Sequence, residues 1–129
     1  HYPRAYGPRS PSFSRAVIHK TQQGHQLFLS GTASIIGHET IAPSDPALQT
    51  QVTIENLSAL LEAAQFPKMR TLGNEASWVV YVRDPQHLDL VRPLITQHIH
   101  PSANIVYLQG DICRKDLMVE IEGTIFRKL

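Results

Sequence analysis

The chain has 129 residues and a formal net charge of +1, a length that suits one domain and a charge that gives no reason to expect a nucleic-acid partner. Hydrophobic residues make up 42% of the sequence, as in an ordinary globular protein, and no apolar run approaches the ~20 residues that a membrane-spanning helix needs. The single cysteine excludes an internal disulfide, which is typical of a reducing, cytoplasmic setting.

The first 13 residues are rich in proline and are predicted to form an extended lead-in to one domain over residues 14–129. Residues 14–20 and 25–30 have the composition of short strands. The Gln-Gln-Gly turn between them predicts a hairpin.

Small residues follow the second strand, in the run Gly31-Thr32-Ala33-Ser34. Side chains without bulk let a ligand or another backbone approach closely. A β-bulge at this point would explain the same residues, so both interpretations stay open.

Two helices are predicted, one on each side of a third strand. The first helix starts after the N-cap Asp45, where a proline occupies the first helical position, and ends near residue 64. Its apolar residues recur at helical spacing. The third strand covers residues 75–83, and the second helix covers residues 86–99.

Residues 104–126 contain two runs of period-two alternation around a charged turn and are predicted to form a closing hairpin. One face of this hairpin would be buried under apolar residues. The other face would carry ionisable groups that either are solvated or line a cleft: Asp111, Cys113, Glu120 and Glu122.

The predicted order is β-β-α-β-α-β-β, an α+β fold in which two helices cover one face of a mixed sheet. The other face would carry Val79, Tyr81 and Tyr107. An apolar face of this kind is normally covered by a partner, so we expect association with more chain or with other subunits.

Three residues of the predicted sheet suggest chemistry on a carboxylate ligand. Arg83 and Arg114 lie at strand ends, and guanidinium groups suit bidentate binding of carboxylates. Glu120 lies beside apolar and aromatic groups, where desolvation can raise the pKa of a carboxyl; a solvated glutamate is the alternative. The seven histidines form no recognised metal spacing, so we predict neither a metal site nor a cofactor.

The element order and four motifs resemble the YjgF/RidA family of small domains. The motifs are FLSGTAS at 28–34, QTQVTIENLSALLEAA at 49–64, WVVYVRD at 78–84 and CRKDLMVEIEG at 113–123. The resemblance implies a chorismate-mutase-like trimer with ligand clefts between sheets. It also implies that an arginine, here Arg114, binds a substrate carboxylate.

A closer resemblance is to the second half of the chorismatase family, which includes chorismate hydrolases and 3-hydroxybenzoate synthases. It is carried by PRSPSFSRA at 8–16, SGTASIIGHE at 30–39, VYVRD at 80–84 and DICRKDLMVEIEG at 111–123. The resemblance implies that Glu120 protonates the enolpyruvyl group of chorismate, which leads to release of pyruvate.

The same resemblance implies that Cys113, seven residues before Glu120, directs the reaction toward 3-hydroxybenzoate. Cys113 would act through shape and polarity; a buried structural cysteine and a covalent nucleophile are the alternatives. We expect the substrate to contact Arg83, Arg114, Tyr81, Gly31 and Ala33. The expected assembly is a homotrimer, or a complex with an N-terminal half that this sequence lacks.

Two other functions remain as alternatives. One is a RidA-type imine or enamine deaminase acting as a trimer, and the other is a non-catalytic YjgF-like ligand-binding domain. Turnover of chorismate would favour the chorismatase interpretation, and hydrolysis of imines would favour the deaminase. Absence of any turnover would favour the binding domain.

Overall fold

The computed structural model describes residues 16–36, 39–41, 45–112 and 116–128. The predicted lead-in, Cys113 and Arg114 therefore lie outside the described residues. The elements, in chain order, are β1 (Ala16–Lys20), β2 (Gly24–Ala33), β3 (Ile35–Ile36), β4 (Glu39–Thr40), α1 (Pro46–Ala63), the 3₁₀ turn η1 (Met69–Thr71), β5 (Ala76–Val82), the 3₁₀ turn η2 (Pro85–His87), α2 (Leu88–Thr96), β6 (Asn104–Gln109) and β7 (Val119–Lys128).

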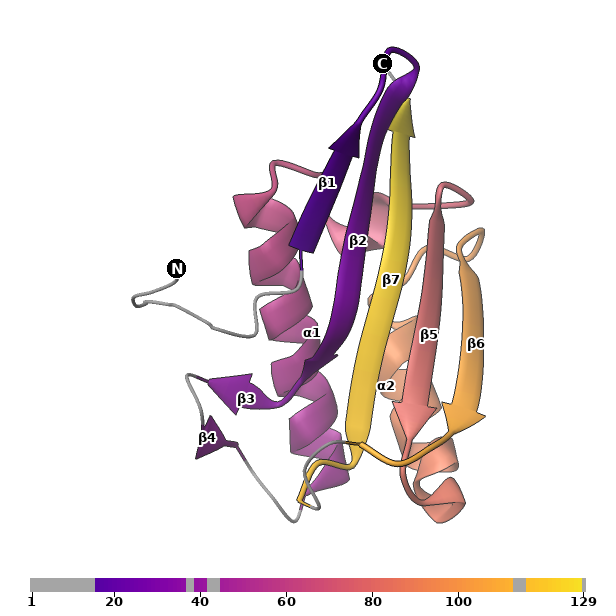
Figure 1. The fold of residues 1–129 in the computed structure, drawn as a ribbon. Coiled ribbons are helices and arrows are strands. Elements are labelled where there is room, and N and C mark those ends of the chain that lie inside the picture. Colours follow the sequence, from indigo (N-terminus) through magenta and orange to yellow (C-terminus); the bar gives the residue numbers. More distant parts are fainter. Residues whose placement is uncertain (1–15, 37–38, 42–44, 113–115, 129) are drawn as a thin grey trace.

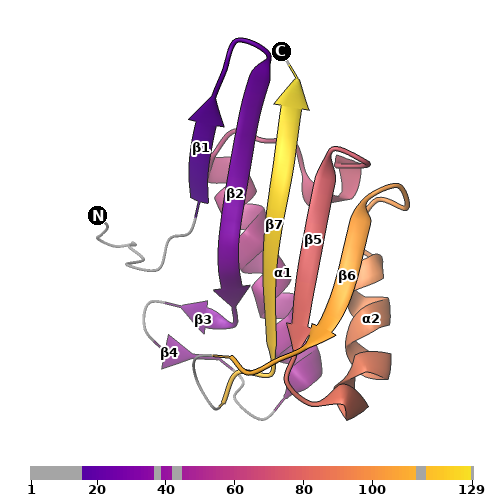
Figure 2. The same ribbon diagram turned by 45° about the vertical axis from the view of Figure 1, so that its right-hand side comes forward.

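Five strands form one twisted sheet in the order β1-β2-β7-β5-β6 (Figure 1). Neighbouring strands are antiparallel, except that β5 and β6 run parallel. Both helices lie on the same face of this sheet, as the turned view in Figure 2 also shows. The predicted α+β class, with two helices on one face of a mixed sheet, is confirmed.

Helix α1 starts where the sequence predicts. The Asp45 side chain accepts a hydrogen bond of 3.0 Å from the backbone N–H of Leu48, and proline occupies the first turn, where a missing N–H costs nothing. The helix turns Ile54, Leu57 and Leu61 toward the sheet, and all three are buried. Complete burial of a leucine or isoleucine contributes about 1.5–3 kcal/mol, so this stripe anchors the helix.

Alternation along β5 and β7 separates a helix-covered face from an open face. Trp78 and Val80 on β5 and Ile121 on β7 are buried beneath the helices. Gly123 makes room for the indole, since a Cβ at this position would stand 2.5 Å from two ring carbons of Trp78. The open face carries the intervening residues of both strands.

The prediction that residues 104–126 form a hairpin is wrong. Strand β6 pairs only with β5, at the sheet edge, whereas β7 lies between β2 and β5. The reason is the connection through α2, which carries the chain back to the start of β5 so that β6 runs parallel to it. Alternation predicted both strands correctly but contained no information on their partners.

The face predicted for Tyr107 is also wrong. Tyr107 is opposite the buried Val80, packs on the core, and has the Arg92 guanidinium 5.1 Å from its ring centroid. Val106 and Leu108 take the open face instead and are 51% and 45% exposed. The open face is therefore apolar, as predicted, but it carries Val106 and Leu108 in place of Tyr107.

Two element boundaries differ from the predictions. Between β2 and α1 the structure contains β3 and β4, which pair in a two-stranded ladder that the predicted element order lacks. The second helix is shorter than predicted, because η2 precedes it and α2 ends at Thr96. Among the described residues, no helix has the length and apolarity required to cross a membrane.

Candidate active site

Glu120 lies on the open face near the start of the central strand β7, in one row with two other predicted site residues. Its Cα is paired with Ala33 on β2 and with Tyr81 on β5. Residues directly opposite one another in a sheet project to the same side, so Tyr81 flanks Glu120 on that side. Glu120 is only partly exposed, and it makes further contacts within the chain.

Strand β2 bulges opposite Glu122, two residues from Glu120 along β7. Leu29 is opposite Gly123 and Thr32 is opposite Ile121, so Ser30 and Gly31 together stand opposite a single residue of β7. A Cβ on Gly31 would be 2.7 Å from both Cδ and Oε2 of Glu120. The bulge interpretation of this small-residue run is therefore confirmed, and the bulge places the bare backbone of Gly31 against the carboxyl group of Glu120. Close approach of a ligand stays a prediction.

Tyr81 links the two glutamates of β7. It stands opposite Glu120, and its hydroxyl donates a hydrogen bond of 2.9 Å to Oε1 of Glu122. This hydrogen bond, followed by burial and the charges of Glu122 and Glu120, raises the pKa of Tyr81 above its ordinary value of 10.0. The phenol therefore stays protonated and remains a hydrogen-bond donor at neutral pH.

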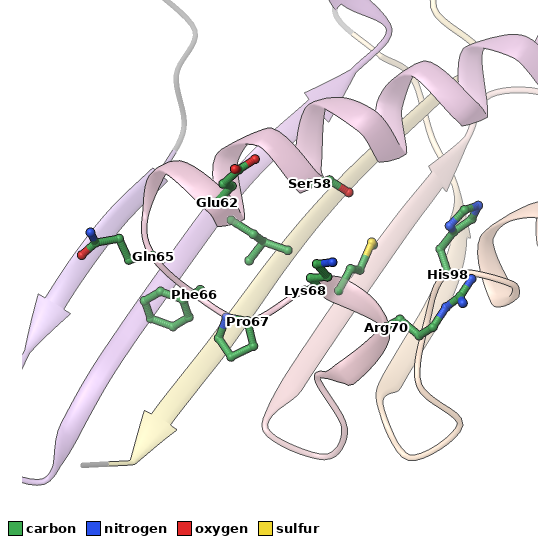
Figure 3. Close-up of a pocket in the computed structure, with 10 residues that line it drawn as sticks. Ser58, Glu62, Gln65, Phe66, Pro67, Lys68, Arg70 and His98 are labelled. Atoms are coloured by element: carbon green, nitrogen blue, oxygen red, sulfur yellow. The ribbon is translucent and has the colours of Figure 1, made fainter.

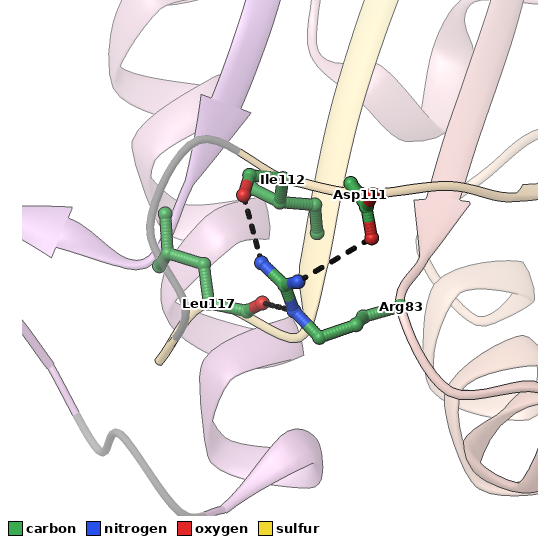
Figure 4. Close-up of polar contacts among 4 residues, drawn as sticks. All are labelled: Arg83, Asp111, Ile112 and Leu117. Carbon is green, nitrogen blue, oxygen red and sulfur yellow. Dashed lines mark hydrogen bonds and ion pairs between the residues drawn. The ribbon is translucent and has the colours of Figure 1, made fainter.

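Arg83 follows β5 and binds the segment between β6 and β7 (Figure 4). Its Nε and one terminal nitrogen each donate a hydrogen bond of 2.8 Å, to the carbonyls of Leu117 and Ile112. The other terminal nitrogen lies 3.7 Å from the carboxylate of Asp111. These contacts fix the chain on both sides of residues 113–115. Binding of a substrate carboxylate by Arg83 stays a prediction.

One buried and one partly buried amide of α1 contact the backbone around the site, and the sequence interpretation missed both. Gln49 bonds to the backbone at Asp116 and Met118 over 2.7 and 2.8 Å. Asn56 donates to the carbonyls of Ala33 and Ile35 over 2.8 and 3.1 Å. Their seven-residue spacing, two helical turns on the core-facing side, was the available signal.

Ala33 belongs to a small apolar cluster apart from the main core. It packs with Ile112 and Leu117, which are 6% and 0% exposed, and with Ile35. The cluster joins the end of β2 to the segment between β6 and β7. The predicted site residues Cys113 and Arg114 lie inside that segment but outside the described residues, so their positions stay predictions.

A groove of about 780 Å³ lies away from these residues, on the helix-covered side (Figure 3). It runs along the C-terminal half of α1 and the turn that follows, with Lys68, Arg70 and His98 beside it. None of the predicted site residues lines it. The groove is therefore separate from the cluster around Glu120. No group of three metal-binding side chains occurs within the described parts of the chain.

Comparisons with known proteins show what this chain is similar to. No family model matches the sequence. The chain is 37% identical to a 3-hydroxybenzoate synthase of Streptomyces hygroscopicus over 134 residues, covering 97% of this chain and 39% of that protein. It is similar to a crystal structure of a chorismatase, with a TM-score of 0.74 and 36% identity over 97% of this chain and 39% of the other.

The fold is shared with single-domain proteins as well. The Escherichia coli YjgF gene product superposes with a TM-score of 0.68 at 22% identity, covering 98% of this chain and 93% of that one. This likeness shows the fold alone, and it confirms the predicted YjgF/RidA-like architecture. The resemblance to chorismatases and 3-hydroxybenzoate synthases is also confirmed, although the chain spans only about two fifths of the length of the curated relatives it matches.

Proposed function

We propose that this chain is the chorismate-cleaving domain of a chorismatase-type enzyme, which releases pyruvate and forms 3-hydroxybenzoate. The similarity to a 3-hydroxybenzoate synthase and to chorismatases along nearly the whole chain supports the substrate class. One observation carries the location: the Glu120 carboxyl stands on the open sheet face near the start of the central strand β7, between the bare backbone of Gly31 and Tyr81 on β5.

Glu120 is the general acid in this proposal. Its proton goes to the terminal methylene carbon of the enolpyruvyl group, which becomes a methyl group, and the resulting cation is stabilised by the ether oxygen. Cleavage of the bond between the ring carbon and the ether oxygen then releases pyruvate, whose new carbonyl oxygen keeps the bonding electrons, and leaves a cation on the ring. The neighbouring ring hydroxyl attacks this cation, and loss of one proton, which can return to the Glu120 carboxylate, gives the aromatic ring of 3-hydroxybenzoate. When the ring product is 3-hydroxybenzoate, the two products together contain the atoms of chorismate, so this branch consumes no water.

The acid must keep its proton until the substrate is bound. Partial burial and the nearby negative charge of Glu122 both favour the protonated form of Glu120. Glu122 accepts the hydrogen bond of Tyr81, which holds its carboxyl on the same face as Glu120. We expect activity to fall as pH rises through the pKa of Glu120, because the protonated form is the active one.

Chorismate carries two carboxylates, so its site needs cations. We propose that Arg114 binds one of them and that Arg83 lies close to the other while it holds the segment that contains Arg114. Gly31 and Ala33 would contact the substrate from β2, and Cys113 would steer the product toward 3-hydroxybenzoate by excluding water from the ring cation.

The open face needs a cover if it is to enclose a substrate. Val106 and Leu108 are about half exposed beside Tyr81, and Phe28 on β2 is 41% exposed. We propose that other copies of the chain in a homotrimer, or the remaining part of a longer enzyme, close this face. The chain matches 39% of the length of the 3-hydroxybenzoate synthase, so we propose both arrangements.

The decisive experiment is Glu120→Gln, which keeps the shape of the side chain and removes the proton donor. We expect turnover of chorismate to fall by about 10²–10⁴-fold, while affinity for the benzoate product is largely kept. Glu122→Gln is the matched control on the same strand face, because the amide oxygen can still accept the Tyr81 hydrogen bond; it should cost only a few-fold. Turnover by Glu120→Gln within a few-fold of the parent protein would exclude this mechanism.

A further inference from the structure

Gln49 joins helix α1 to the chain segment that leads into the proposed catalytic strand. Its side-chain nitrogen donates to the Asp116 carbonyl over 2.7 Å, and its side-chain oxygen accepts from the Met118 N–H over 2.8 Å. Gln49 is 0% exposed, which is unusual for a glutamine. Such burial is tolerated because both ends of the amide are hydrogen-bonded.

The two contacts have the geometry of a strand neighbour. In an extended chain, the C=O of one residue and the N–H of the residue two positions later point to the same side. One primary amide offers a donor and an acceptor side by side, so it can bond to both groups at once. The Gln49 side chain therefore acts as a single peptide unit paired with residues 116–118, just before β7 begins.

Helix capping and packing fix the position of Gln49. Its backbone N–H donates to the Asp45 carbonyl over 2.9 Å, and its own carbonyl accepts a hydrogen bond of 2.8 Å from the Thr53 hydroxyl. Gln49 thus stands in the first turns of a helix held against the sheet. Any displacement of its amide would have to move the helix or break the bonds to the 116–118 segment.

Arg83 bonds to the same segment from the other side. Its backbone N–H donates to the Met118 carbonyl over 3.0 Å, and its guanidinium holds the carbonyls of Leu117 and Ile112. Residues 116–118 are therefore held by the helix and by β5 together. They lie between residues 113–115 and Glu120, which is only two positions after Met118.

We propose that Gln49 is a positioning residue for the reaction: its amide fixes the backbone of residues 116–118, which leads into β7, and thereby places Glu120. This inference rests on the proposed function. Substitution of a residue that only stabilises the fold would lower the melting temperature without a specific effect on turnover. A positioning residue also changes kcat and the product ratio, since a misplacement of about 1 Å at the reacting groups can cost roughly 10²-fold in rate.

The test compares Gln49→Met with Thr50→Val. Methionine fills a similar volume and removes both hydrogen bonds. Thr50 is the matched control because it is the next residue of the same helix, is also 0% exposed, and donates its hydrogen bond of 2.7 Å within the helix, to the Pro46 carbonyl. Both substitutions should lower the melting temperature, so stability alone does not separate them.

Three measurements separate the two variants. Hydrogen exchange of the Met118 amide should be faster in Gln49→Met than in Thr50→Val, because only Gln49→Met removes the acceptor of that amide. The kcat for chorismate should fall at least 10-fold in Gln49→Met, with a KM change of a few-fold, and the share of 3-hydroxybenzoate among the products should change. Thr50→Val should keep the parent kcat and product ratio.

If Gln49→Met does not fold, Gln49→Glu provides the comparison of kcat and product ratio, because it removes the donor to Asp116. It keeps the acceptor for Met118, so exchange of that amide is not compared in this variant. Equal kcat values and product ratios in the Gln49 and Thr50 variants would refute the positioning role. Absence of chorismate turnover in the parent protein, tested both as the oligomer and within the longer enzyme, would refute the proposed function. Equal kcat values in an active parent background refute the positioning role alone, so the two failures are distinguishable.

Discussion

The contact between Gly31 and Glu120 predicts that Gly31→Ala will reduce activity while the fold persists. The added Cβ would stand 2.7 Å from Cδ and Oε2 of Glu120 and 3.1 Å from Oε1, whereas ordinary contact begins near 3.4 Å. The φ of Gly31 lies outside the left-handed region, so alanine can take the same backbone conformation without strain. The clash must therefore be relieved at the carboxyl group.

The size of the effect follows from these distances. Moving Cδ from 2.7 Å to at least 3.4 Å displaces the carboxyl by about 0.7 Å. Rotation at the far end of a glutamate side chain is inexpensive, and we expect the free energy of unfolding to change by less than about 1 kcal/mol. Catalysis is less tolerant, and we expect kcat for chorismate to fall by roughly 10–100-fold.

Two other glycines provide controls in the same assays of chorismate turnover and thermal unfolding. Gly73→Ala adds a Cβ at 3.4 Å from Glu75 and His100, in ordinary contact far from the site, and should change neither measurement. Gly123→Ala places its Cβ 2.5 Å from the rigid, buried ring of Trp78, so it should cost about 1–3 kcal/mol of stability or more.

A double variant tests whether Gly31→Ala lowers turnover by moving the Glu120 carboxyl. If Gly31→Ala acts only by moving the Glu120 carboxyl, it should cause no further loss of turnover in protein that already carries Glu120→Gln. The reasoning fails if Gly31→Ala keeps parental turnover, or if the two losses multiply in the double variant.

Three further predictions concern the phenol, the cysteine and the open face. In a spectroscopic tyrosine titration, with Tyr81→Phe used to assign the signal, Tyr81 should ionise above pH 10.0. Glu122→Gln should lower the pKa of Tyr81, because it removes a negative charge that opposes ionisation of the phenol. An unchanged titration in Glu122→Gln would contradict this. Because the folded state favours the neutral phenol, this contribution to stability is complete below about pH 10.0 and is lost as pH rises through the higher pKa of Tyr81. Cys113→Ala should shift products from 3-hydroxybenzoate toward the hydrolysed diene-diol while turnover persists, and chromatography showing one identical mixture would reject the steering role. Light scattering at tens of micromolar should show this chain alone as a trimer or other oligomer, whereas a well-folded monomer would argue against a covered face around Val106 and Leu108.

Local patterns in the sequence predicted the elements well but not their partners. The alternation of β7 correctly placed Glu120 and Glu122 on the face opposite Ile121, because a period of two reports which side of a strand is buried. The same rule did not reveal that β5 would lie between β6 and β7. Strand order depends on the path of the helix that connects the strands, which has no local signature.

Residues of the candidate site that lie in a sequence motif could be predicted. Contacts between residues far apart in the sequence could not. Gly31 attracted attention as a small residue after a strand, yet its contact with Glu120 depends on a bulge opposite β7. Gln49 looked like one polar residue of a helix. Its two partners are 67 and 69 positions away, so only the folded chain shows that they meet.

The central position of β7 has a consequence for how this domain folds. The hairpin of β1 and β2 and the unit of β5, α2 and β6 can each form from neighbouring stretches of chain, but each leaves an unpaired strand edge until β7 inserts between them. Pairing between β2 and β7 joins positions about 100 residues apart, such as Gly24 and Lys128, and contacts of such long range slow folding. Because Glu120 is on the closing strand, no intermediate that lacks β7 can hold the acid in place. Such intermediates would expose two sheet edges, so chaperone dependence and aggregation during expression should be most sensitive to substitutions in β7.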